Sequence, residues 1–466
     1  MSDVSDSNVS DANLSGIRVI RTAGALAGYS AAIALTRGPL QWMLAAPLAL
    51  IPLLSWILRS PDAWLTLFFA VALLAPPLPI AFGNSGPHPA LIFAALGVVI
   101  GFLRLDEWRF RRGLLPGTLI LFFAMLAISV GPAALYSGPE IALQSLARAG
   151  LAGISVWVFF YVAMGPGRAG SIPIHRIYWV ALASAGFACL DFYYQFPAPA
   201  GFGAQYIWLD SGVYRRAQGL FYEASALGNF CAFFLVMTAV ALVRGAANRA
   251  VLLAGGGVFA AALMFSYSRS SVANVVIAIA VLAVMERKRP AVRKAAMLAA
   301  GSLVALGIVL YRYFPAYAGL YWVRLQASVT YALSSNEVVL SGRAESWRVL
   351  GRFLLEHPWH ALLGVGYKTL PYSDFIGQRV VADNMYLSIL AETGVVGLAA
   401  LVLLNFAIVR EGYRAARSGD AKKSFYGTWI FCFWIAEAAQ MMSADLLTFW
   451  RVLPLYLWVL AMAVRR

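Results

Sequence analysis

The chain has 466 residues, of which 61% are hydrophobic and only 12% are charged, and its formal net charge is +15. Typical soluble domains are about 45–50% apolar and about 25% charged, so this composition excludes a water-soluble core. The positive charge does not indicate nucleic-acid binding, because most Lys and Arg residues lie in short links between apolar runs and form no separate basic domain.

Long apolar runs recur from residue 40 to the end of the chain. They predict an all-α polytopic membrane protein, because about 20 apolar residues span a bilayer as a helix. Residues 1–16 are expected to be a disordered N-terminus, and 18–36 form either a weak span or an interfacial helix. In total we predict about 12 to 14 transmembrane helices. The candidate spans are 40–58, 62–82, 89–104, 114–133, 147–165, 172–193, 220–242, 250–267, 270–286, 295–311, 385–409, 425–441 and 446–463.

Strongly basic links alternate with links that carry few basic residues. The basic ones lie at 104–112, 244–249, 286–294 and 410–423, and the chain ends in Arg465-Arg466. The positive-inside rule places these links in the cytoplasm and the intervening links outside. The predicted layout is therefore a helix bundle at 17–311, a long external loop at 312–383 and C-terminal transmembrane helices at 384–466.

The external loop at 312–383 has substantial apolar content, and a loop of this length is usually functional. Within it, residues 343–356 predict an amphipathic helix. Arg343 lies on its apolar stripe, in line with Trp347, and so should point inward. A buried charge needs a partner, which would be either an anionic ligand or a structural ion pair with an acid such as Asp383.

Further arginines lie at the external face, where the positive-inside rule does not expect them. Arg269 lies among serines between two apolar runs, and Arg215 and Arg216 precede the span at 220–242. Arg269 could simply snorkel to the interface, and the Arg215–Arg216 pair could be solvated. Alternatively, these side chains bind phosphate, for which Arg is suited. The ligand at that depth would be a lipid-linked phosphate or diphosphate.

The span that follows the loop begins with polar residues. Asp383 could cap this helix or act as a general base, while Asn384, Ser388 and Glu392 form a polar stripe. The sequence has no Walker A motif, no metal-ligand spacing and no acidic pair on an external loop, so we expect neither a metal nor a cofactor.

The order and spacing of short motifs around the external loop resemble the O-antigen ligase and O-antigen polymerase superfamily. Tyr267-Ser-Arg269 and residues 216–228 fit the same pattern. The loop motifs are Ser341-Gly-Arg-Ala-Glu-Ser-Trp347, His357-Pro358, Leu363-Gly-Val-Gly-Tyr367, Asp383-Asn-Met-Tyr-Leu387 and Ala391-Glu-Thr-Gly394.

The resemblance implies a bacterial inner-membrane glycosyltransferase of the GT-C type that needs no metal. Such enzymes take glycan from undecaprenyl diphosphate at the periplasmic face and transfer it to a glycan or lipid acceptor. Two arginines recognise the diphosphate in the family, and the matching positions are Arg269 and Arg343. Arg216 and Arg215 would assist them. Trp347, Asn384 and Tyr386 would lie at the acceptor side, and other polysaccharide-assembly proteins are expected partners.

The chain departs from the family at one position, because the ligases carry a histidine where it has Asp383. A carboxylate is ordinarily a weaker base than an imidazole. Asp383 could replace the histidine, or His360, His357 or Glu392 could take the role. The departure favours a polymerase for exopolysaccharide or O-antigen. The alternatives are an O-antigen ligase that transfers glycan to lipid A-core, a lipid-linked glycan flippase or transporter, and a non-catalytic scaffold.

Overall fold

The computed structural model describes residues 27–36, 41, 52–57, 59–78, 87–166, 173–198, 202–209, 212–245, 248–288 and 343–465, and isolated positions between 308 and 326. The chain divides into two units, Met1–Ala63 and Trp64–Arg466, and the candidate site lies within the second unit. The predicted spans at 295–311 and most of 40–58 fall outside the described residues. The full number of spans therefore stays a prediction.

The described part of the chain is almost entirely helical, with a single pair of short strands. Five helical segments are long and apolar enough to cross a membrane: Leu114–Ser137, Pro139–Met164, Ile174–Tyr194, Ala224–Arg244 and Met385–Ala416. The all-α polytopic class is thereby confirmed. The helices are α3 (Ala63–Leu74), α4 (Ala90–Leu103), η1 (Leu105–Glu107), α5 (Leu114–Ile128), α6 (Val130–Ser137), α7 (Pro139–Met164), α8 (Ile174–Tyr194), η2 (Gly219–Phe221), α9 (Ala224–Arg244), α10 (Arg249–Phe265), α11 (Arg269–Met285), α14 (Arg343–Glu356), α15 (Pro358–Leu363), α16 (Met385–Ala416), α17 (Ala421–Gln440), η3 (Leu446–Thr448) and α18 (Leu453–Val464).

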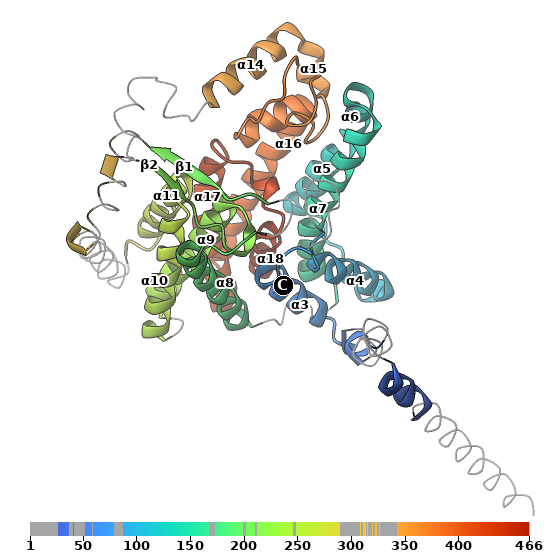
Figure 1. Ribbon diagram of the computed structural model, residues 1–466, viewed down its shortest axis with the longest axis vertical. Coiled ribbons are helices and arrows are strands. Elements are labelled where there is room, and N and C mark those ends of the chain that lie inside the picture. The colour runs from blue at the N-terminus through green and yellow to red at the C-terminus, as the bar shows by residue number, and fades with distance from the viewer. Residues whose placement is uncertain are drawn as a thin grey trace, which may run out of the picture. The chain divides into compact units, whose positions relative to one another are not determined.

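Helix α17 lies at the centre of the bundle, in contact with α9, α11, α16 and α18 (Figure 1). Its Trp429 ring lies 4.3 Å from that of Phe233 on α9, and Phe233 lies 4.4 Å from Tyr456 on α18. Trp429, Phe233 and Tyr456 are all fully buried. Large aromatic side chains bury much area and favour such tilted contacts, so they hold these helices together.

Polar side chains from α9, α11, α17 and α18 form a buried network, which we call the amide network. Its members are Asn229, Asn274, Glu437, Gln440 and Tyr456. Both asparagine amides donate to Glu437 Oε2, at 2.6 Å and 2.8 Å, and to Gln440 Oε1, at 3.1 Å and 2.9 Å. The Tyr456 hydroxyl donates to Asn229 Oδ1. Buried polar groups need such partners, and the network links α9, α11, α17 and α18.

An antiparallel hairpin precedes α9. Strand β1 (Tyr206–Leu209) pairs with β2 (Gly212–Arg215), with Tyr206 opposite Arg215. Ile207 and Tyr267 are buried together in a small cluster at this hairpin. The Arg216 amide then donates to Gln205 O at 2.9 Å, which carries the pairing one step further. The hairpin therefore fixes where the chain enters η2 and α9.

Helix α14 covers the residues at which the sequence predicts the amphipathic helix. Leu350 and Leu354 on its apolar stripe are buried against Val365, Leu370, Val380, Ala382 and Ala391. Arg348 lies on the opposite, exposed face, 3.2 Å from Glu345. The stripe thus holds α14 against the segment that leads into α16.

Two glycines allow the segment before α16 to touch that helix through its backbone. Gly394 has φ 76° inside α16, and a Cβ there would lie 2.1 Å from Leu362 O. Gly364 has φ 78°, and a Cβ there would lie 2.4 Å from Glu392 O. Only glycine adopts this backbone at so close an approach without strain. The loop after α15 is consequently fixed directly to α16.

Candidate functional site

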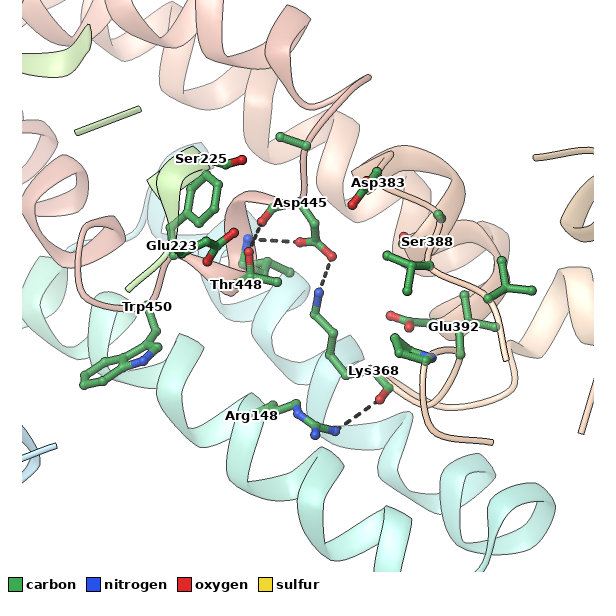
Figure 2. Close-up of a pocket in the computed structure, with 18 of the residues that line it drawn as sticks. Arg148, Glu223, Ser225, Lys368, Asp383, Ser388, Glu392, Asp445, Thr448 and Trp450 are labelled. Atoms are coloured by element: carbon green, nitrogen blue, oxygen red, sulfur yellow. Dashed lines mark hydrogen bonds and ion pairs between the residues drawn. The ribbon is translucent and has the colours of Figure 1, made fainter. Parts of the chain in front are cut away.

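A cavity of about 580 Å³ lies where the segment before α9, the loop after α15 and the turn before α18 meet α7, α14 and α16 (Figure 2). We call it the charged cavity. Among its described lining residues are four cationic and four acidic side chains. These are Arg148, Arg216, Arg343 and Lys368, and Glu223, Asp383, Glu392 and Asp445.

Two of the cations are held by backbone carbonyls. Arg148 Nη1 on α7 donates to Lys368 O at 3.2 Å, and its guanidinium lies 4.0 Å from the centre of the Tyr372 ring. Arg216 Nε donates to Ser266 O at 2.8 Å. A guanidinium group carries a permanent charge and five N–H donors, so groups that are fixed in this way are suited to recognise an anion.

Lys368 lies in the middle of the cavity wall (Figure 2) and forms an ion pair with Asp445. Its backbone has φ 55°, a left-handed conformation that costs a non-glycine residue roughly 1–3 kcal/mol. Burial disfavours the ammonium charge, but Asp445 and Glu392 outweigh burial and raise the pKa of Lys368 above its ordinary value. Lys368 therefore stays charged in this wall.

The acids have different surroundings. Asp445 Oδ1 accepts from the Leu447 amide at 3.1 Å, while its other oxygen faces Lys368. Glu392 is almost fully buried and faces the backbone amides of Lys368 and Leu370, so it ties the loop to α16. Burial raises the pKa of the Glu223 carboxyl to about 7, although Lys368 and Arg216 oppose this shift.

Arg343 and Asp383 form the ion pair that the sequence left open as one alternative, with Nε 3.2 Å from Oδ2. Asp383 also has a left-handed backbone, with φ 45°. The Trp347 indole donates to Ala382 O at 2.7 Å and so connects α14 to this position. The residue that caps α16 is Asn384, whose Oδ1 accepts from the Leu387 amide at 3.1 Å. Asn384, and not Asp383, therefore caps α16.

Seven residues that the sequence proposed for the site are described by the structure but do not line the charged cavity: Arg215, Arg269, Trp347, His357, His360, Asn384 and Tyr386. Arg215 pairs with Asp191 at 3.5 Å, and the Tyr386 hydroxyl donates to Ala438 O at 2.8 Å. Arg269 begins α11, close enough to Arg343 for the two charges to repel each other.

His360, which was proposed as an alternative base, lies outside the lining. It packs among aromatic rings, with Tyr136 at 4.9 Å, Phe375 at 5.3 Å and Phe353 at 5.5 Å. Burial and the neighbouring His357 lower its pKa. The cavity thus contains Arg216, Arg343, Asp383 and Glu392 of the residues proposed for binding and catalysis.

Sequence reasoning missed Arg148, Lys368, Asp445 and Glu223. Arg148 carried a usable signal, because it lies at the external end of a predicted span, as the other noted arginines do. Glu223 and Asp445 are acids at the edges of apolar runs, which is also unusual. Lys368 directly follows the Leu363-Gly-Val-Gly-Tyr367 motif. Among the residues that the structure describes, no group of three or more His, Cys, Asp or Glu could hold a metal ion.

A comparison with known protein families finds a match, which covers part of the charged cavity. Residues 250–402 match the family model described as O-antigen ligase. No curated protein matches the chain in sequence. The matched segment includes Arg343, Lys368, Asp383 and Glu392, whereas Arg148, Arg216, Glu223 and Asp445 lie outside it. The chain is therefore a multi-pass membrane protein that carries, at residues 250–402, a segment similar to the O-antigen ligases.

Proposed function

We propose that this chain is a polysaccharide polymerase of the bacterial inner membrane. It transfers glycan from an undecaprenyl-diphosphate carrier to a second lipid-linked glycan at the periplasmic face, for exopolysaccharide or O-antigen assembly. The observation that carries the proposal is the charged cavity, where cations from four separate segments meet beside the matched family segment. Its volume is typical of ligand pockets.

The diphosphate binds to arginines. Arg343 and Arg216 line the cavity, and Arg269 lies within electrostatic range of Arg343. Guanidinium groups bind phosphate oxygens through paired hydrogen bonds. The charges of Arg269 and Arg343 repel each other, and a diphosphate that contacts both guanidinium groups would offset this repulsion.

The reaction joins an acceptor hydroxyl to the anomeric carbon of the donor sugar. The acceptor oxygen forms a bond to that carbon while the bond from carbon to the diphosphate oxygen breaks. The electron pair leaves with the diphosphate, whose developing charge the arginines stabilise. The hydroxyl proton passes to a carboxylate of the cavity. No other reactant is needed for the atoms and charges to balance.

A ligase that transfers glycan to lipid A-core is the second candidate, because the matching family model carries that description. Asp383 favours the polymerase, since the resemblance implies a histidine at this position in ligases. The predicted layout, with an external loop at 312–383 between membrane-spanning parts, remains part of the proposal. Further partners would be other polysaccharide-assembly proteins.

The test is a gel profile of carrier-linked and surface glycan from cells that lack the gene and carry either wild-type protein or one variant. Arg343→Ala is expected to reduce long-chain glycan by about 10²–10³-fold at unchanged protein level, as loss of one charge-stabilising group does. Arg348→Ala is the matched control, because this arginine lies five residues away on the exposed face of α14. It should behave as wild type.

The pattern of products decides among the alternatives. Single repeat units that stay on the carrier after deletion indicate a polymerase. Long chains that remain on the carrier and never reach lipid A-core indicate a ligase. Normal long chains in the Arg343→Ala strain would contradict the transferase. Movement of carrier-linked glycan across liposomes by purified protein, without bond formation, would indicate a transporter.

A further inference from the structure

Glu223 differs from the other acids of the charged cavity in the hydrogen bonds and ion pairs of its carboxylate. Asp445 uses one oxygen for Lys368 and the other for the Leu447 amide, and Asp383 pairs with Arg343. Glu392 accepts from the backbone amides of Lys368 and Leu370, and its Oε2, which has no hydrogen-bond partner among the described residues, has almost no solvent-accessible surface. Among the described residues, none forms a hydrogen bond or ion pair with the Glu223 carboxylate.

The local structure explains why this side chain remains available. Glu223 occupies the N-cap position of α9, where an acidic side chain would ordinarily bind the first amides of the helix. Its side chain makes no such bond here. Gln205 Oε1 accepts from the Ala224 amide at 2.9 Å, and the Glu223 carboxylate lies in the cavity lining beside Trp450 and Thr448 (Figure 2).

The backbone before Glu223 is also held in place. Tyr222 has φ 56°, a left-handed conformation that is uncommon outside glycine. Gln218 Nε2 donates to Tyr222 O at 2.9 Å and to Gly203 O at 3.0 Å. Strained residues that the surroundings fix in this way cluster at functional sites. The hydrogen bonds therefore hold the peptide that orients Glu223.

We propose that Glu223 is the catalytic base that accepts the proton of the acceptor hydroxyl. This inference rests on the proposed transferase function and assigns to Glu223 the role that the resemblance gives to the residue at position 383. As the acceptor oxygen bonds to the anomeric carbon, its proton moves to a Glu223 carboxylate oxygen. The carbon–oxygen bond to the diphosphate breaks, and the diphosphate leaves with the electron pair.

The charges around Glu223 suit this task. The cations within electrostatic range are Lys368, Arg216 and Arg451, and the acids are Asp445 and Asp383. Burial dominates and places the pKa of Glu223 at about 7. When the pKa of a base lies near the working pH, a substantial fraction of the base is deprotonated and it still binds the proton strongly enough to accept it.

The experiment uses purified full-length protein added to membranes of the deletion strain, which supply the carrier-linked repeat. Chain elongation is measured as a function of substrate concentration and pH. Glu223→Gln keeps the shape of the side chain but cannot take the proton, so turnover should fall about 10²–10⁴-fold with little change in apparent KM. Asp383→Asn should act mainly on KM, because it releases Arg343.

Glu223→Asp is a second variant, which tests the assignment even when Glu223→Gln does not fold. Wild-type elongation should rise with pH through about 7, as the base loses its proton. Aspartate ordinarily has a lower pKa than glutamate, so this rise should move to lower pH in Glu223→Asp. A purely structural role for Glu223 would leave the pH profile unchanged.

Three results would overturn the assignment: turnover of folded Glu223→Gln within tenfold of wild type, an unmoved pH profile in Glu223→Asp, or a larger turnover loss in Asp383→Asn than in Glu223→Gln. With wild-type elongation intact, each of them leaves the proposed function standing. Absence of elongation by the wild-type protein, with carrier-linked repeat present, would instead refute the proposed function and this assignment together.

Discussion

The charged cavity and the amide network are both polar regions inside a largely apolar protein, but they are built differently. In the amide network, Asn229 and Asn274 bind the same oxygen of Glu437 from two helices. The charged cavity instead contains full charges, most of them on loops and helix ends, and two of these residues, Lys368 and Asp383, have left-handed backbones. The contrast indicates that the network stabilises the bundle, whereas the cavity keeps charge available for a ligand.

The largest effect that would test this contrast is expected at Lys368. Lys368→Met leaves Asp445 buried without its cation, and breaking a buried pair from one side costs about 3–5 kcal/mol. We expect lower thermal stability in detergent together with loss of chain elongation. The measurements are a thermal unfolding curve and the glycan profile.

A double variant separates the two effects of that change. Lys368→Met with Asp445→Asn removes both charges, and the asparagine can still accept from the Leu447 amide. Most of the stability should return, while elongation should stay lost. Elongation near the wild-type level in the double variant would show that the pair serves only as a structural contact.

A smaller effect is expected in the amide network. Glu437→Ala removes one of the two acceptors that both asparagine amides share, and each lost hydrogen bond between membrane helices costs about 0.6–1.7 kcal/mol. The unfolding temperature should fall, but elongation per folded molecule should match wild type. A loss of activity without a loss of stability would assign the network to the reaction.

The smallest effect is expected for Glu437→Gln. The amide oxygen of glutamine can still accept from Asn229 and Asn274, so the free energy of unfolding should change by less than about 0.6 kcal/mol. The same Glu→Gln exchange at Glu223 should abolish elongation. Equal outcomes for the two exchanges would remove the distinction between the regions.

The sequence predicts the helices that are marked by a local pattern of apolar residues. The apolar runs correspond to helices such as α9 and α16, and the period of the loop helix places Leu350 inward and Arg348 outward, as found. The starts of several helices differ from the predicted spans. Helix α7 begins at Pro139, eight residues before the predicted span at 147–165. Residues 219–221 form η2 ahead of α9, and residues 446–448 form η3 ahead of α18.

The partners that complete the site depend on contacts between distant segments. Lys368 and Asp445 are 77 positions apart, and Asn229 and Glu437 are 208 apart, so no local period indicates either pair. Pairing depends on how the helices pack, which one sequence does not reveal. Arg343 was found because its charge contradicts the apolar stripe around it. Glu223 was missed because its place in the cavity depends on the loop after α15 and the turn before α18, which lie far from it in the sequence.

The backbone contact at Gly364 and Gly394 limits how this protein could be recombined with similar proteins. A Cβ at either position would collide with the backbone of the other segment, so residues 358–394 form a unit whose two halves fit only each other. Chimeras made to alter sugar preference should therefore inherit this unit whole from one parent. An exchange point within α14, whose contacts are made by side chains, should be tolerated better than one between Leu362 and Gly394.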